Sequence, residues 1–177
     1  MNVFEEREGP ERFSDLWYAL HVKPRTEKKV FEWLEHYRCW RHLPLYMKVR
    51  KVQRRKVRRY LPLFPGYVFA RLSWDNRRKM LGTNLIVRTI PLLDARLTIH
   101  QLRQVSRVSK KAGPEMKKLA RTFKAGDYVR VKFGPFMGTE GYVKRDGDRT
   151  MLVLNVEMLG AAVEVSVSPD NIERIAV

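Results

Sequence analysis

The chain has 177 residues, of which 44% are hydrophobic; this is enough for one ordinary domain or two small ones and excludes wholesale disorder. The formal net charge of +17 indicates a polyanionic partner. No apolar run approaches the roughly 20 residues of a membrane helix, and the acidic N-terminus differs from a secretory signal. Cys39 is the only cysteine, which excludes an internal disulfide and a structural zinc site. These features predict a cytoplasmic protein.

The positive charge is unevenly distributed along the chain. Residues 1–122 contain 29 Lys and Arg against 11 Asp and Glu, a net charge of +18, whereas residues 123–177 contain 7 against 8, a net charge of −1. We therefore expect a basic part and a near-neutral part with different partners.

A polar N-terminal tail over 1–14 precedes the first predicted elements. The run LWYALHVKP over 16–24 predicts a strand that stops at Pro24. Residues 25–38 predict an amphipathic helix with Thr26 as its N-cap. Its apolar side recurs at helical spacing, at Val30, Phe31, Leu34 and Tyr37.

A basic hairpin and two more helices complete this part. Two extended segments over 43–62 surround a turn without Asn-Gly or Asp-Gly, so a long, loosely ordered tip is expected. Strands are predicted over 66–72 and 85–90, with a helix between them that starts at Ser73 or Asp75 and stops at Gly82. A third helix covers 98–111, with its apolar side at Ile99, Leu102, Val105 and Val108. This order predicts an α+β domain over 15–108, a mostly antiparallel sheet flanked by helices.

The remaining residues change character. Residues 109–122 are polar and cationic around Gly113-Pro114, which favours a flexible linker over a continued helix. Residues 123–177 contain short alternating segments separated by glycine turns, two of them around the turn at 146–149. This pattern predicts a small all-β barrel.

The sequence contains no recognisable catalytic or metal-binding pattern. No phosphate loop, nucleophile elbow or carboxylate pair occurs, and the histidines are too scattered for a metal site. They are His21, His36, His42 and His100. We therefore expect no enzyme, cofactor or metal; an enzyme would require a pocket with perturbed ionisable groups.

The densest charge lies over 48–59, where 8 of 12 residues are basic. They are Lys48, Arg50, Lys51, Arg54, Arg55, Lys56, Arg58 and Arg59. A charge run is usually a solvated face, but acids hardly compensate this one, and phosphates would relieve its self-repulsion. We expect salt-dependent nucleic-acid binding with little sequence preference. Weaker candidates are the cluster of Lys23, Arg25, Lys28 and Lys29 and the cluster of Arg77, Arg78 and Lys79.

An apolar stretch, YLPLFPGYVFARL over 60–72, follows this block directly. Pro65 restricts the backbone and Gly66 frees it just before a strand, which can orient Phe64 and Tyr67 in controlled directions. One interpretation is packing in the core. The other is a rigid apolar docking patch, in which a few such side chains dominate binding.

Three segments, in this order and at this spacing, resemble the NusG family of transcription elongation factors: LWYALHVKPRTEKKV, LFPGYVFARL and FKAGDYVRVKFGPFMGTEGYV. The first two are similar to the N-terminal (NGN) domain of that family, and the third to its KOW motif. The resemblance covers roughly residues 16–177. It implies an RNA polymerase-binding NGN domain over 15–108 and an SH3-like KOW barrel over 123–177.

The resemblance further implies how the protein acts. An apolar patch would bind the clamp helices of the β′ subunit, and the domain would bridge the DNA cleft to the β-subunit gate loop. Such bridging would suppress pausing by preferential binding to the active polymerase. By position, the clamp-helix contact comprises Phe64, Pro65 and Tyr67. The gate-loop side comprises Arg77, Arg78 and Lys79.

The other expected contacts involve nucleic acid and a second protein. The cationic hairpin would face upstream DNA, the displaced non-template strand or nascent RNA. The KOW domain would contact a small-subunit ribosomal protein or the Rho termination factor through Met158 and Leu159. Leu159-Gly160 replaces the phenylalanine-glycine pair of the housekeeping pattern, and the N-terminal domain is unusually basic. Both departures indicate a specialised, operon-specific antiterminator.

Two further expectations concern the conformation of the C-terminal domain and the class of protein to which the chain belongs. One branch of the family stores its C-terminal domain as a helical hairpin, but the Val-rich segments and glycine turns here predict strands. The alternative class is a KOW-containing ribosomal or RNA-binding protein acting in translation. The total charge favours it, and the near-neutral charge of 123–177 argues against it. No surface suggests an obligate dimer, so a monomer is expected.

Overall fold

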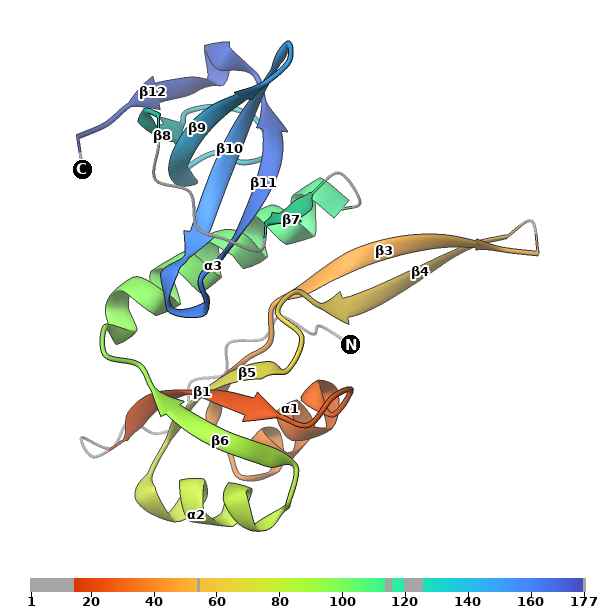
Figure 1. Cartoon of the computed structure of the whole chain (residues 1–177), viewed down its shortest axis with the longest axis vertical. Helices are drawn as coiled ribbons and strands as arrows, with labels where there is room; N and C mark the ends of the chain where they lie inside the picture. The colour runs from red at the N-terminus through yellow and green to blue at the C-terminus, as the bar shows by residue number, and fades with distance from the viewer. Residues whose placement is uncertain (1–14, 54, 114–115, 120–125, 177) are drawn as a thin grey trace. The chain divides into compact units, whose positions relative to one another are not determined.

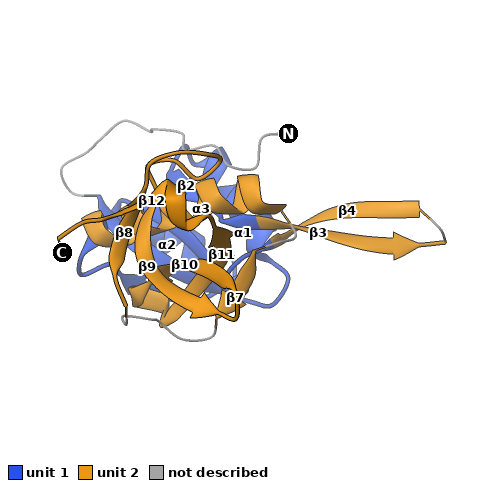
Figure 2. Ribbon diagram, turned by 90° about the horizontal axis from the view of Figure 1, so that it is seen from above, with its two compact units in different colours: residues 1–45, 62–95 blue, residues 46–61, 96–177 orange. Residues whose placement is uncertain are grey.

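The computed structural model describes residues 15–53, 55–113, 116–119 and 126–176 (Figure 1). The tail predicted over 1–14 lies outside them. The chain divides into two compact units, which Figure 2 distinguishes by colour: unit 1 comprises residues 1–45 and 62–95, and unit 2 comprises residues 46–61 and 96–177. No helix among the described residues is long and apolar enough to cross a membrane.

Unit 1 is built on a four-stranded sheet with the order β2-β5-β1-β6, in which all neighbours are antiparallel. Its strands are β1 (Leu16–Val22), β2 (Trp40–His42), β5 (Tyr67–Leu72) and β6 (Ile86–Pro91). Its helices are α1 (Glu27–His36) and α2 (Trp74–Gly82). The predicted mostly antiparallel sheet and its two helices are confirmed, while β2 is too short for its pattern to have predicted it.

The core of unit 1 follows the strand alternation. Every second residue of β1 and β5, such as Leu20 and Val68, is buried with Val30 and Leu34 of α1 and Met80 of α2. Side chains two apart on a strand lie on the same face, so one face of this sheet is covered by α1 and α2. The amphipathic pattern predicted for the first helix therefore marks its buried side correctly.

Two helix ends differ in detail from the prediction. Thr26 occupies the N-cap position of α1, but its hydroxyl donates to the Lys23 carbonyl and caps no helix amide. Ser73 caps α2 as expected, because its hydroxyl accepts from Asn76 N at 3.2 Å. Gly82 is the last helical residue, and the positive φ that ends the turn is taken by Asn84.

Unit 2 contains a two-stranded hairpin, one long helix and a six-stranded sheet. The hairpin consists of β3 (Leu45–Val52) and β4 (Arg55–Pro62), whose outer residues Leu45 and Pro62 belong to unit 1. The expectation of a long tip is wrong, because β3 ends at Val52 and β4 begins at Arg55, which leaves only two residues between the strands. One of these two, Arg54, lies outside the described residues. The long helix, α3 (Ala95–Ala112), starts earlier than predicted.

The six-stranded sheet has the order β12-β8-β9-β10-β11-β7, with antiparallel neighbours throughout. Its strands are β7 (Lys117–Leu119), β8 (Tyr128–Val131), β9 (Glu140–Asp146), β10 (Arg149–Val156), β11 (Ala161–Val167) and β12 (Ile172–Arg174). The prediction of strands in place of a helical hairpin is confirmed, as is the turn at 146–149. A Cβ on Gly141 would lie 2.4 Å from the Val153 carbonyl oxygen, so the strands there approach too closely for a side chain.

The segment predicted as a linker carries structure. Its first four residues continue α3 to Ala112, and β7 pairs with β11 at the edge of the six-stranded sheet. Glu164 of β11 is only 3% exposed, and its carboxylate lies 2.6 Å from Lys144 Nζ and 3.9 Å from Lys117 Nζ. A buried carboxylate needs such partners, so these contacts tie β7 to the sheet. The domain limits themselves stay a prediction.

Candidate functional site

The Phe-Pro-Gly-Tyr turn of unit 1 is held by hydrogen bonds that Gly66 makes to the Glu27 side chain and to the Val22 backbone. Gly66 takes φ +83°, a conformation that residues with a Cβ rarely adopt. Its N–H donates to Glu27 Oε1 at 2.8 Å, and its carbonyl accepts from Val22 N at 2.8 Å. Tyr67 N donates to the Phe64 carbonyl at 3.2 Å. The turn is therefore fixed against β1 and the first turn of α1.

The side chains of this turn have different exposures. Phe64 is 8% exposed, so its ring is mostly buried. Pro65 is exposed and Tyr67 is half-buried. The Tyr67 ring stacks on His21 of β1, with ring centroids 5.3 Å apart and an interplanar angle of 30°. Phe64 therefore packs inward, as the core interpretation expects, whereas Pro65, Tyr67 and His21 remain accessible. The docking patch stays a prediction.

The three cations of α2 lie against aromatic rings. Arg77 Nε donates to Thr89 Oγ1 at 2.8 Å, and its guanidinium lies 5.4 Å from the Tyr18 ring centroid. Arg78 lies 5.7 Å from the Trp74 ring and Lys79 5.7 Å from the Tyr37 ring. Trp74 is 68% exposed, so Arg78 and Trp74 form a mixed cationic and aromatic surface.

The described cations of the hairpin are all exposed: Lys48, Arg50, Lys51, Arg55, Lys56, Arg58 and Arg59. No Asp or Glu occurs from Tyr46 to Leu61, so the hairpin contains no internal compensation for them. Exposed apolar residues intervene, including Val49, Val52 and Tyr60, the last 47% exposed. An acid-free, two-stranded ribbon of cations suits a polyanion, because bound phosphates would reduce the mutual repulsion.

Met158 and Leu159 lie in a short 3-10 helix, η2 (Glu157–Leu159), and both are half-buried. Gly160 ends η2 with a positive φ of +59°. The amide of Glu157 donates to Gln101 Oε1 of α3 at 3.0 Å. The loop expected to bind a second protein is thus hydrogen-bonded to α3 within unit 2.

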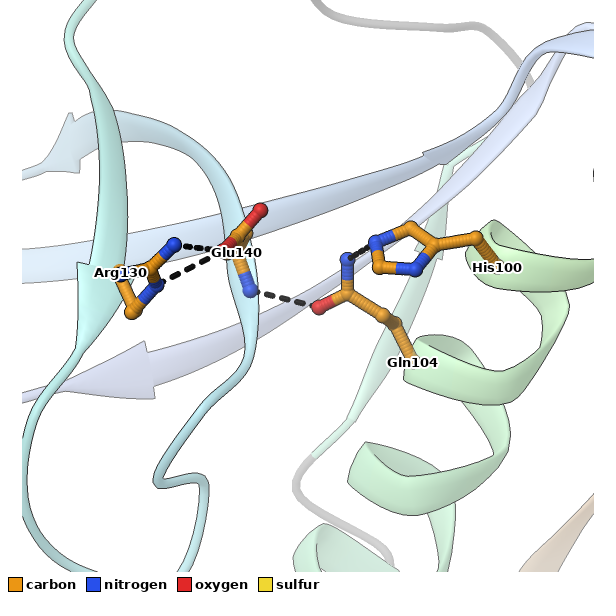
Figure 3. Close-up of polar contacts among 4 residues, drawn as sticks. All are labelled: His100, Gln104, Arg130 and Glu140. Carbon is orange, nitrogen blue, oxygen red and sulfur yellow. Dashed lines mark hydrogen bonds and ion pairs between the residues drawn. The ribbon is translucent and has the colours of Figure 1, made fainter. Parts of the chain in front are cut away.

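A second contact joins α3 to the six-stranded sheet (Figure 3). Gln104 Oε1 accepts from Glu140 N at 2.6 Å, and Gln104 Nε2 lies 2.7 Å from His100 Nε2. Arg130 donates to Glu140 Oε1 through Nε at 2.8 Å and Nη2 at 2.7 Å. Gln101 and Gln104 lie three residues apart, which places them on one face of the helix.

A cavity of about 160 Å³ lies between this face of α3 and the sheet. Its lining includes Leu97, Gln101, Tyr128 and Tyr142. Burial, and then the negative charge of Glu140, raises the pKa of Tyr128. The Tyr128 hydroxyl is protonated at neutral pH, so it can donate or accept a hydrogen bond at the edge of this cavity.

The described residues contain no cluster of three potential metal ligands. Burial raises the pKa of the Cys39 thiol to about 11, against an ordinary value of 9.0. Asn76 Nδ2 donates to its sulfur at 3.3 Å. A buried thiol with a raised pKa is a weak nucleophile, because the reactive form is the thiolate.

Sequence reasoning missed Glu27, His21, Gln101 and Gln104 as contributors to these surfaces. Glu27 is 6% exposed, and a carboxylate in the first turn of a helix is usually explained by the helix dipole. Its partner Gly66 lies 39 residues away. No local pattern reports such a pairing, although a buried acid next to an apolar helix face is a signal that it has a specific partner.

A family model described as "Transcription termination factor nusG" matches residues 15–119, more than half of the chain. The chain belongs to the NusG family. The matched range contains the Phe-Pro-Gly-Tyr turn, the cationic hairpin and α3.

Individual relatives are similar over nearly the whole chain. The transcription termination/antitermination protein NusG of Staphylococcus carnosus (strain TM300) is 27% identical, with 90% of this chain and 95% of the relative covered. The NusG of Staphylococcus aureus (strain Mu50 / ATCC 700699) has the same identity and coverage. The low identity is consistent with a paralogue. A solved structure titled "Crystal Structure of MjSpt4:Spt5 complex conformation B" is 17% identical over 92% of this chain and 98% of that one, with a TM-score of 0.29.

Proposed function

We propose that the chain is a transcription elongation/antitermination factor that binds RNA polymerase through unit 1 and nucleic acid through its cationic hairpin. The observation that carries the proposal is the NusG family match over residues 15–119. This range joins an aromatic turn held by hydrogen bonds to a hairpin without acidic residues. The factor acts by binding and not by covalent chemistry.

The docking surface is the exposed side of the Phe-Pro-Gly-Tyr turn. Pro65 and Tyr67 contact the clamp helices of the β′ subunit. Phe64 is buried and has a packing role in the same turn. A rigid turn suits this role because little conformational entropy is lost on binding. The side of α2 that faces the β-subunit gate loop comprises Trp74, Arg78 and Lys79. Arg77 is hydrogen-bonded to Thr89. Bridging the two would favour the active polymerase and suppress pausing.

The six-stranded sheet is the KOW domain in this proposal, and it recruits a small-subunit ribosomal protein or a termination factor. Met158 and Leu159 of η2 are the contact residues, and half-buried apolar side chains in a short loop suit a protein partner. The near-neutral charge of residues 123–177 also favours a protein over nucleic acid.

The test is an elongation and pausing assay with the cognate polymerase, together with a binding assay. Tyr67→Ala with Pro65→Ala removes the two accessible side chains of the turn and leaves Phe64 in place. Arg58→Gln with Arg59→Gln removes hairpin charge, and Arg145→Gln with Arg149→Gln removes the same charge from exposed positions on β9 and β10. We expect the first pair to abolish polymerase binding, the second to bind but lose the antipausing effect, and the third to behave as wild type.

Normal polymerase binding by a folded Pro65→Ala, Tyr67→Ala variant would contradict the clamp-helix assignment. Crosslinking of the wild-type chain to ribosomal RNA without polymerase binding would support a KOW-containing protein of translation instead.

A further inference from the structure

The base of the hairpin is bordered on one face by Gly113, directly after α3, and on the other by Lys118 of β7. Tyr46 and Met47 are neighbours on β3, so their side chains point to opposite faces. A Cβ on Gly113 would lie 3.2 Å from Met47 Cε, which places the backbone after α3 against one face. Lys118 Nζ of β7 lies 4.1 Å from the Tyr46 ring centroid on the other. All four residues belong to unit 2.

The two lysines of β7 point to different surroundings. Lys117 Nζ lies 3.6 Å from Asp146 Oδ2 and 3.9 Å from Glu164 Oε1, so it faces carboxylates of the sheet. Lys118 faces the hairpin. Its burial, and then the positive charge of Lys48, lower its pKa. Such a repulsion between two lysines would be relieved by a shared anion.

One face of β3 continues this positive surface toward the hairpin tip. Tyr46, Lys48 and Arg50 alternate along the strand and share that face, at intervals of about 6.6–6.8 Å. Lys48 and Arg50 are exposed, and Lys118 lies over the Tyr46 ring. Cations that flank an aromatic ring in a row are the usual means of following a single-stranded phosphate backbone.

We propose that Lys118 is part of the nucleic-acid-binding surface, so that a phosphate backbone bound to the Tyr46, Lys48 and Arg50 face of β3 continues onto the edge strand β7. This inference rests on the proposed binding of nucleic acid by the hairpin, and it assigns to that site a residue from a different sheet. A polynucleotide bound in this way links the hairpin to the six-stranded sheet.

The test measures the affinity of the full chain for a fluorescent single-stranded DNA, an RNA of the same sequence and the corresponding duplex over a range of KCl concentrations. Lys118→Met removes the charge and keeps the aliphatic stem, and Lys118→Arg keeps the charge. Lys132→Met is the matched control, because Lys132 is exposed and also lies over a ring, Phe133, at 5.8 Å. The comparison of DNA with RNA shows which polynucleotide supplies the phosphates.

The expected result is a loss of one phosphate contact in Lys118→Met. The slope of log K against log [KCl] should fall in magnitude by about 0.7 for the single strands or about 0.9 for the duplex. Lys118→Arg and Lys132→Met should retain the wild-type slope. Lys48→Gln should reduce the slope by the same amount without altering the ring contact.

Two results would overturn the inference in distinguishable ways. An unchanged slope in Lys118→Met and Lys48→Gln, with a reduced slope in Arg58→Gln, Arg59→Gln, would show that Lys118 only packs on Tyr46 while the hairpin still binds nucleic acid. An unchanged slope in all of these variants would reject nucleic-acid binding by the hairpin altogether.

Discussion

At Gly66 the backbone adopts a φ of +83°, and the hydrogen bond from its amide to Glu27 sets the direction in which Pro65 and Tyr67 project. The nearest atom to a Cβ placed there is His21 Cδ2 at 3.6 Å, an ordinary contact. The requirement for glycine at this position is therefore conformational and not steric. A residue with a Cβ would be strained wherever its side chain pointed.

We expect Gly66→Ala to lower the free energy of unfolding by about 1–3 kcal/mol and to weaken polymerase binding. Gly82→Ala is the control, because nothing lies within 4 Å of its Cβ position and it is helical; this variant should be neutral or up to about 1 kcal/mol more stable. Urea denaturation of both variants measures the difference. If Gly66→Ala and Gly82→Ala had equal free energies of unfolding, the turn would tolerate a different backbone conformation.

The buried thiol of Cys39 predicts a specific dependence of stability on pH. Its pKa in the folded chain is about 11, above the ordinary value of 9.0 that it takes in an unfolded chain. The protonated thiol is therefore favoured by folding. Its contribution is fully present below the unfolded pKa and is lost as the pH rises through the folded pKa.

Between about pH 9 and 11, the free energy of unfolding should fall more in wild type than in Cys39→Ala, by roughly 2–3 kcal/mol. The difference between the two chains isolates the thiol from tyrosines and lysines that titrate in the same range. Parallel pH profiles in chemical denaturation would contradict the assignment of the raised pKa.

At the scale of elements, α3 is held to the six-stranded sheet by side-chain amides. Gln101 and Gln104 accept hydrogen bonds from the backbone amides of Glu157 and Glu140. Each such bond contributes about 0.5–1.5 kcal/mol. A cavity of about 160 Å³ adjoins these two bonds, so the packing beside them is incomplete.

We expect Gln101→Ala with Gln104→Ala to accelerate hydrogen exchange at the amides of Glu140 and Glu157, because both donors lose their acceptors. The amides within β10 and β11 should keep their protection, since they pair with each other. Lys111→Ala, at an exposed position in the last turn of α3, is the control and should leave all four regions unchanged. Unaltered exchange in the double variant would mean that the two contacts are not formed in solution.

At the scale of the whole molecule, charge and contacts divide the chain differently. Residues 1–122 have a net charge of +18. The most basic part of that range, the hairpin, nevertheless belongs with α3 and the six-stranded sheet in unit 2. The chain passes from one unit to the other after Leu45, Leu61 and Ala95. Sequence order alone suggests an N-terminal domain followed by a linker and a C-terminal domain, and the contacts add a hairpin and a helix to the second compact unit.

The sequence by itself determined the types of the elements, the acid-free charge of the hairpin and the family. Strand alternation, helical spacing and turn residues are local properties, so β1, α1, β5 and the turn at 146–149 could be predicted from a few neighbouring residues. The family follows from motifs in their order. Three-residue strands such as β2 and β7 carry too little pattern for the same reasoning.

Only the tertiary structure decided which side chains of the predicted sites are accessible and what holds them. Glu27 reaches Gly66 across 39 residues, Gln104 reaches the Glu140 amide across 36, and Lys118 covers Tyr46 of a different sheet. The same fold buries Phe64 and leaves Pro65 exposed. These outcomes depend on how separate elements pack, and the energy of such contacts comes from burial and pairing that no local sequence pattern records.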